Sequence, residues 1–126
     1  MFIHIRLDSD SPIYIQLIYQ IKMGIIKKQL LPGEVLPSVR SLAGDIGINM
    51  HTVNKAYKQL EIEGILINKK NGFEVKKTNK IKMEDSKREL FHLKLSELMI
   101  DAAIFQLTDQ ELNKMKKAVQ NQLQER

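Results

Sequence analysis

A short polar segment in the middle of the chain carries side chains that complement the edges of nucleic-acid bases. It reads Asn-Met-His-Thr-Val-Asn-Lys over residues 49–55. An Asn amide can form two hydrogen bonds with adenine, a His ring can donate to guanine, and Thr or Met can contact the thymine methyl group. We predict base contacts by Asn54 and His51, and phosphate contacts by Thr52 and Lys55. The full set of predicted contacts in this segment is Asn49, Met50, His51, Thr52, Asn54 and Lys55.

The residue patterns that enzymes and metal sites need are not found in the sequence. His4, His51 and His92 are far apart and belong to no ligand motif. The chain has no cysteine, which excludes disulfides and thiolate metal sites and favours a reducing compartment. It also has neither a Gly-rich phosphate loop nor a nucleophile elbow. We predict a protein that is not an enzyme and needs no metal or cofactor.

Two short helices are expected to present the polar segment. The first spans about residues 37–46, and Gly47 follows where a left-handed residue ends a helix at low cost. Asn49 is a favourable N-cap for the second, which ends at Gly64. The apolar inner faces are Val39, Leu42, Ala43 and Ile46 in the first helix, and Val53, Ala56, Tyr57 and Leu60 in the second. Two helices joined by a tight glycine turn are typical of a helix-turn-helix.

A further helix and a hairpin flank this pair. Ser11 and Pro12 predict a helix start, with Ser11 as the cap, and residues 31–33, Leu-Pro-Gly, are expected to stop that helix. After Gly64, apolar runs at residues 65–67 and 73–75 surround an Asn-Gly pair, which predicts a β-hairpin. A basic hairpin directly after a helix-turn-helix is typical of a wing.

Positive charge is concentrated where these elements lie. The chain has a net charge of +5, and residues 38–80 hold eight basic and four acidic residues, a local net charge of +4. Such a local excess is expected of a surface that binds a polyanion. The predicted contacts outside the polar segment are Ser38, Arg40, Lys69, Lys70 and Gly72.

Simpler interpretations of the same residues stay open at this point. Asn49 can serve only as a helix cap, and His51 can be an ordinary surface residue. Arg40 can form a structural ion pair with Asp45 or Glu61, and the wing lysines can be solvated without any contact. Tyr14 and Tyr57 fall on apolar faces, and we interpret them as core residues.

The last third of the chain reads as a helical hairpin. From about residue 85, apolar residues are spaced 4, 3, 4 and 3 apart, which is typical of helix-on-helix packing. Thr108 and Glu111 form a capping box that starts a last helix. These helices carry more apolar surface than one hairpin can bury, so we predict a dimer; the alternative is that they fold back on the protein's own first helix. The predicted dimerisation residues are Phe91, Leu95, Leu98, Ala102, Phe105, Leu112, Met115 and Val119.

Residues 11–75 resemble the N-terminal domain of the GntR family of bacterial regulators. The matching residues are Pro12-Ile13-Tyr14, Gln16, Leu31-Pro32-Gly33-Glu34, Leu36-Pro37-Ser38-Val39-Arg40, Leu42-Ala43, Thr52-Val53, Ala56-Tyr57, Leu60-Glu61 and Glu63-Gly64. The short two-helix tail is similar to that of the YtrA subfamily. The resemblance implies DNA contact by Arg40, dimerisation through the tail, no dedicated effector pocket, and control of a neighbouring operon that often encodes an ABC transporter.

Three positions depart from the family pattern. Met50-His51 stands where the subfamily usually has Pro-Asn. The wing of the family usually has two glycines near an Arg, whereas here only Gly72 follows Lys69, Lys70 and Asn71. Asn54 stands where other subfamilies have Arg. These departures leave the expected fold unchanged and leave the recognised DNA sequence open.

Together these observations predict a mostly α fold with a small β-hairpin wing. The predicted domains are a winged helix-turn-helix over residues 1–78 and a helical dimerisation tail over residues 79–126. The predicted function is a dimeric, cytoplasmic DNA-binding transcription regulator, most simply a repressor, that binds an inverted-repeat operator. No membrane segment or secretion signal is expected, and the sequence assigns no effector. The alternative is a winged helix for protein–protein interaction that binds DNA only incidentally.

Overall fold

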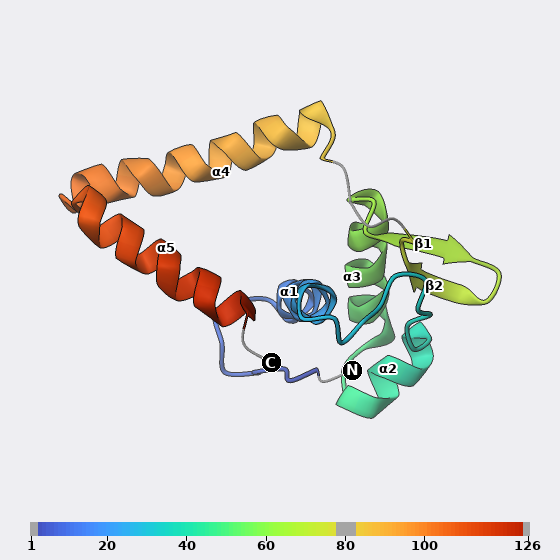
Figure 1. Ribbon diagram of the computed structural model, residues 1–126. Coiled ribbons are helices and arrows are strands. Elements are labelled where there is room, and N and C mark those ends of the chain that lie inside the picture. Colours follow the sequence, from blue (N-terminus) through green and yellow to red (C-terminus); the bar gives the residue numbers. More distant parts are fainter. Residues whose placement is uncertain (1–2, 78–82, 125–126) are drawn as a thin grey trace. The chain divides into compact units, whose positions relative to one another are not determined.

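The computed structural model describes residues 3–77 and 83–124 of the chain. In chain order the elements are α1 (Ile13–Ile26), α2 (Val39–Ile46), α3 (Met50–Ile62), β1 (Leu66–Lys69), β2 (Gly72–Val75), α4 (Asp85–Ile104) and α5 (Asp109–Gln124) (Figure 1). The predicted mostly α fold with one small hairpin is confirmed. None of the helices in the described ranges has the length and apolar character needed to span a bilayer.

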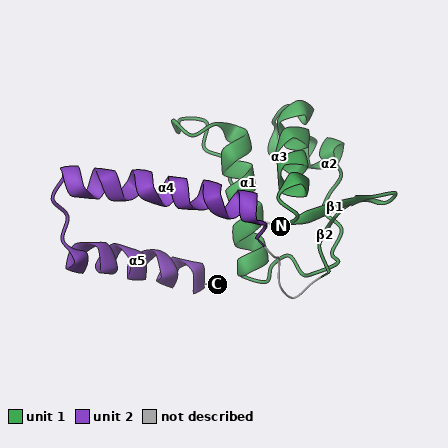
Figure 2. Cartoon of the chain, turned by 90° about the horizontal axis from the view of Figure 1, so that it is seen from above, with its two compact units in different colours: residues 1–81 green, residues 82–126 purple. Residues whose placement is uncertain are grey.

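The chain divides into two compact units, coloured separately in Figure 2. The first, Met1–Ile81, contains α1 to β2, and the second, Lys82–Arg126, contains α4 and α5. The boundary predicted after residue 78 falls within residues 78–82, which lie outside the described residues.

The first unit is built around one apolar core. Leu17 and Ile21 of α1 are fully buried against α3, and Leu66 and Val75 close the core from the hairpin. The predicted inner faces of α2 and α3 are confirmed: Leu42, Ala43, Val53, Ala56, Tyr57 and Leu60 are buried, and Val39 and Ile46 pack against them. Because four fully buried residues line one side of α3, its opposite side is left to solvent.

Both ends of α1 differ from the prediction. Pro12, not Ser11, occupies the N-cap position, with an extended ψ of 146°, and no side chain caps the helix. The helix ends at Ile26, before Leu31-Pro32-Gly33. Lys28 adopts a left-handed φ of 61°, and the Gly24 carbonyl accepts hydrogen bonds from the amides of residues 29 and 30. This backbone turn stops the helix without needing the proline.

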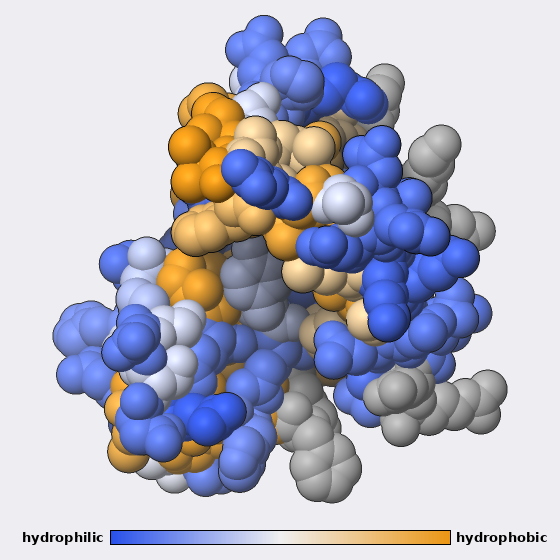
Figure 3. All heavy atoms as spheres, turned by 90° about the vertical axis from the view of Figure 1, so that its left-hand side faces the viewer, coloured by the Kyte–Doolittle hydropathy of each residue, from blue (hydrophilic) through white to orange (hydrophobic). Residues whose placement is uncertain are grey.

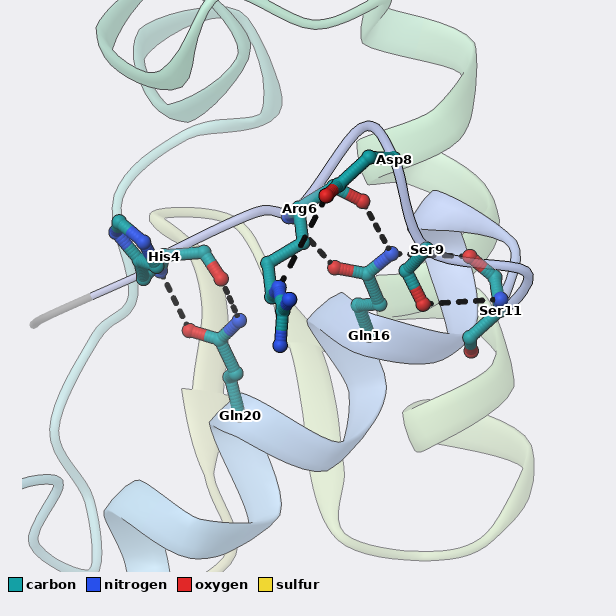
Figure 4. Close-up of polar contacts among 7 residues, drawn as sticks. All are labelled: His4, Arg6, Asp8, Ser9, Ser11, Gln16 and Gln20. Carbon is teal, nitrogen blue, oxygen red and sulfur yellow. Dashed lines mark hydrogen bonds and ion pairs between the residues drawn. The ribbon is translucent and has the colours of Figure 1, made fainter.

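The segment before α1 is held to the helix by two glutamine side chains (Figure 4). Gln16 accepts from the Arg6 amide and donates to the Arg6 carbonyl, both at 2.9 Å. Gln20 makes the same two-way contact with the backbone of His4. Each side-chain amide thus replaces the partner strand that an extended segment would otherwise need. Ile3 and Ile5 pack against the core.

The wing is a two-stranded antiparallel hairpin. Lys69 pairs with Gly72, so the turn consists of residues 70 and 71, and both strands reach further into the predicted tip than the sequence indicated. The other edge of β2 is bound by the segment before α2, because Val35 bridges Glu74 and the Leu36 amide donates to the Phe73 carbonyl. This pairing ties the beginning of α2 to the wing.

The second unit has little core of its own. In α4 and the described part of α5, Ala102 is the one buried apolar residue. Thr108 Oγ1 accepts a hydrogen bond from the Glu111 amide at 3.1 Å, as expected for the first half of the predicted capping box. Most of the large apolar residues at helical spacing, such as Phe91, Leu98 and Phe105, are exposed on the surface of the single chain.

Candidate nucleic-acid interface

The turn between α2 and α3 has the local geometry that the sequence predicts. The Ser38 side chain caps α2 by accepting from the Ser41 amide, and Asn49 caps α3 by accepting from the His51 amide. Between the two helices Gly47 adopts a left-handed φ of 71°, which a residue with a side chain would reach only with strain. The cap role of Asn49 is therefore confirmed, and its amide nitrogen makes no hydrogen bond with any described residue.

The first turns of α3 present a polar face to solvent. Asn49, His51, Asn54 and Lys55 are exposed, as is Met50, whereas Thr52 is half-buried. Val53 is fully buried on the opposite side. Burial of one side of the helix thus fixes which side chains are available to a partner. The structure brings together the residues of the polar segment that the sequence singled out.

Tyr57 anchors α3 to its surroundings. Its hydroxyl donates a 2.8 Å hydrogen bond to the Pro37 carbonyl, just ahead of α2. Its ring meets that of Phe73 on β2 edge to face, with ring centres 5.1 Å apart. Burial raises the pKa of the Tyr57 hydroxyl well above its usual value. One side chain therefore connects α3 with both α2 and the wing.

Lys55 lies over an aromatic ring. Its Nζ is 3.8 Å from the centre of the Tyr14 ring on α1, a close cation–π contact. We interpreted Tyr14 from the sequence as a core residue only, and it does pack against the core. The additional contact was missed because nothing in the local spacing indicates that α1 crosses α3 at this point. Tyr14 restricts where the Lys55 ammonium can lie.

Arg40 is free to contact a ligand. Its side chain is exposed in the first turn of α2. The predicted alternative, an ion pair with Asp45 or Glu61, is wrong: among the described residues Arg40 forms no ion pair, and Glu61 lies 3.9 Å from Lys58 instead.

The two lysines at the wing tip have different surroundings. Lys70 is exposed in the turn, whereas the Lys69 Nζ lies 2.9 Å from the carboxylate of Glu74 on the facing strand. Gly72 has a φ of 115°, which other residues rarely adopt. Glu74 is buried, although its position between two apolar strand residues predicts exposure. Its burial was missed because the Val35 segment, which pairs with the outer edge of β2 at Glu74, is distant in sequence.

Residues 13–75 match the model of the gntR family of bacterial regulatory proteins. The chain belongs to this family. The matched segment runs from the start of α1 to the end of β2, so it includes both helices of the helix-turn-helix and the wing. This GntR-family chain is accordingly a transcription regulator with a winged helix-turn-helix domain, and not an enzyme.

Similar proteins include regulators of the same size. The chain is 41% identical over 95 residues to the HTH-type transcriptional repressor YtrA of Bacillus subtilis, covering 75% of this chain and 73% of that protein. A crystal structure named as a transcriptional antiterminator from Listeria monocytogenes is 30% identical with a TM-score of 0.89, covering 98% of this chain and 92% of the other. YtrA from Sulfolobus acidocaldarius, a GntR-family transcription factor, is 35% identical with a TM-score of 0.60, covering 94% and 97%. The resemblance to YtrA-type regulators thus extends into the tail.

Proposed function

We propose that this regulator is a dimeric repressor that binds an inverted-repeat operator in the cytoplasm and excludes polymerase from the promoter. The observation that carries the proposal is the exposed polar face at the start of α3, held outward by the buried residues behind it. A helix of this kind places its N-terminal side chains against base edges in the major groove.

The side chains of this face divide into two roles. His51 and Asn54 reach base edges, because an imidazole and an amide can both distinguish one base pair from another. Lys55 and Thr52 bind phosphates and set the register of the helix on the duplex. Asn49 and Met50 complete the contact at the first turn of α3. Every one of these residues belongs to one helix end, so they reach the same few base pairs together.

Residues outside α3 extend the contact along the DNA backbone. Ser38 and Arg40 lie at the start of α2, where free backbone amides also favour an anion. Lys70 and Gly72 bring the wing against the backbone or the minor groove, with Lys69 beside them. Because several phosphates are neutralised at once, binding weakens steeply as the salt concentration rises.

The two helices of the tail form the dimer contact, in which their exposed apolar residues pack against a second copy of the same chain. Phe91, Leu98 and Phe105 are 60%, 66% and 74% exposed. Large apolar side chains that are exposed together along one side of a helix indicate a protein–protein contact. Figure 3 shows apolar side chains gathered on the surface. The other predicted residues of the contact are Leu95, Leu112, Met115 and Val119, whereas Ala102 is already buried within the single chain. Two-fold symmetry then doubles the DNA contacts and matches an inverted repeat.

The regulated genes are proposed from the subfamily resemblance. YtrA-like regulators are expected to control a neighbouring operon, often one that encodes an ABC transporter. The 41% identity to the repressor YtrA of Bacillus subtilis supports repression as the mode of action. No small-molecule effector is assigned.

A gel shift tests DNA recognition directly. The protein is titrated into the DNA upstream of its own gene and into random DNA of equal length, at two salt concentrations. We expect tighter binding to the upstream DNA. Asn54→Ala should reduce that preference by about 5- to 150-fold, since one base contact contributes ~1–3 kcal/mol. Asn113→Ala, on the exposed surface of α5, is the matched control. Equal, salt-sensitive binding to both DNAs would refute sequence-specific recognition and favour a protein-interaction module.

A further inference from the structure

A buried carboxylate in the wing has a lysine as its counter-ion. The Glu74 side chain is 6% exposed, and the Lys69 Nζ lies 2.9 Å from its Oε1. Among the described residues this oxygen accepts no hydrogen bond, so the ion pair with Lys69 is its one recorded polar contact. Glu74 therefore depends on Lys69 for compensation of its charge.

The strand register keeps the two groups together. Lys69 of β1 pairs with Gly72 of β2, and Glu74 lies two residues after Gly72 on β2. The side chains of Lys69 and Glu74 are therefore diagonal neighbours on one face of the hairpin. The bridge between Val35 and Glu74 places the Val35 segment along the other edge of β2, beside Glu74. The Lys69 side chain itself is 45% exposed, so the ammonium forms the outer side of the pair.

Exchange of partners would be unfavourable. If the Lys69 ammonium moved to a DNA phosphate, Glu74 would remain buried as an uncompensated charge, which is strongly destabilising. A phosphate on the DNA surface is solvated and is readily neutralised by salt cations. Keeping the intramolecular pair is thus the lower-energy arrangement.

We propose that Glu74 withholds Lys69 from the DNA backbone. The pair stays intact in the complex, and the tip of the wing neutralises phosphate through Lys70, not through Lys69. Glu74 is then a positioning residue that sets how much non-specific, salt-dependent affinity the wing contributes. This inference rests on the proposed DNA binding and refines the role of the wing within it.

The salt dependence of binding to a random-sequence duplex tests the inference. Fluorescence anisotropy gives the slope of log affinity against log salt for the natural chain, Glu74→Gln, Lys70→Gln and the double variant Lys69→Gln with Glu74→Gln. Gln keeps the shape of the carboxylate and removes its charge. We expect Glu74→Gln to steepen the slope by about 0.9, the value for one additional neutralised phosphate. The double variant should keep the natural slope, because the pair carries no net charge, and Lys70→Gln should lower the slope by about 0.9.

The opposite pattern overturns the inference. If Lys69 neutralises a phosphate in the natural chain, Glu74→Gln leaves the slope unchanged and the double variant lowers it by about 0.9. Circular dichroism checks that each variant is folded. If Glu74→Gln does not fold, the double variant decides alone, since it leaves no buried charge: an unchanged slope supports the inference and a lower slope refutes it. Failure of the natural chain to bind DNA even at low salt would instead refute the proposed function.

Discussion

Replacing Tyr57 by Phe tests how α3 is held against α2 and the wing. The substitution removes the hydroxyl that donates a 2.8 Å hydrogen bond to the Pro37 carbonyl and keeps the ring that packs edge to face on Phe73. A buried acceptor left without its donor costs about 1–3 kcal/mol. Because this hydrogen bond is only partly buried, we expect the lower half of that range, about 1–2 kcal/mol at neutral pH.

The same variant has a defined pH signature. Tyr57 is fully buried, and burial raises the pKa of its hydroxyl above the ordinary value of 10.0. Above pH 10 the unfolded chain therefore releases this proton while the folded chain retains it, and the free energy of unfolding falls as the pH rises. The loss is about 1.4 kcal/mol per pH unit. Tyr57→Phe has no such proton to lose. The difference in free energy of unfolding between the natural chain and this variant should therefore decrease by about 1.4 kcal/mol between pH 8 and pH 11.

Urea denaturation at pH 8 and pH 11 measures both effects. Tyr14→Phe is the matched control at pH 8, because Tyr14 is half-buried and, among the described residues, its hydroxyl makes no hydrogen bond. We expect that control to change the free energy of unfolding by less than about 0.5 kcal/mol. A deficit of Tyr57→Phe that is the same at both pH values would refute the argument that the buried hydroxyl retains its proton.

Three further substitutions test the proposed roles of the surface. Arg40→Ala should weaken operator binding by about 1–3 kcal/mol in a gel shift with unchanged thermal stability; unchanged affinity would contradict its contact role. Asn49→Ala removes the cap of α3 and should lower the free energy of unfolding by about 1 kcal/mol in urea, and a neutral result would show that the cap is replaced by water. Leu98→Glu should turn the dimer into a monomer in analytical ultracentrifugation, whereas Leu93→Glu, off the seam on the same helix, should leave the dimer intact. Dissociation by both, or by neither, would argue against the seam as the dimer contact.

Local patterns in the sequence predicted the elements that carry the site. Spacing alone placed Val53 and Tyr57 on the buried side of α3, which leaves His51 and Asn54 on the other side. Gly47 marked the turn, because a left-handed residue is needed there. Such signals are reliable because helix periodicity, caps and turns depend on residues only a few positions apart.

Contacts between distant segments could not be predicted in the same way. Glu74 alternates with apolar strand residues, yet it is buried on a strand whose outer edge pairs with the distant Val35 segment. Lys55 lies over Tyr14 only because α1 crosses α3 at that place. Neither partner is indicated by spacing, since each lies on another element.

The amino-acid sequence by itself determined the order of the helices, the Asn49 and Thr108 caps, the glycine turn, the wing and the family to which the chain belongs, because each depends on short-range patterns. The tertiary structure alone decided which charges are available to a ligand: Arg40 has no ion-pair partner among the described residues, Lys55 lies on an aromatic ring, and Lys69 is paired with Glu74. The physical reason is that a charge is neutralised by whatever lies within a few ångströms, and only the folded chain brings those groups together.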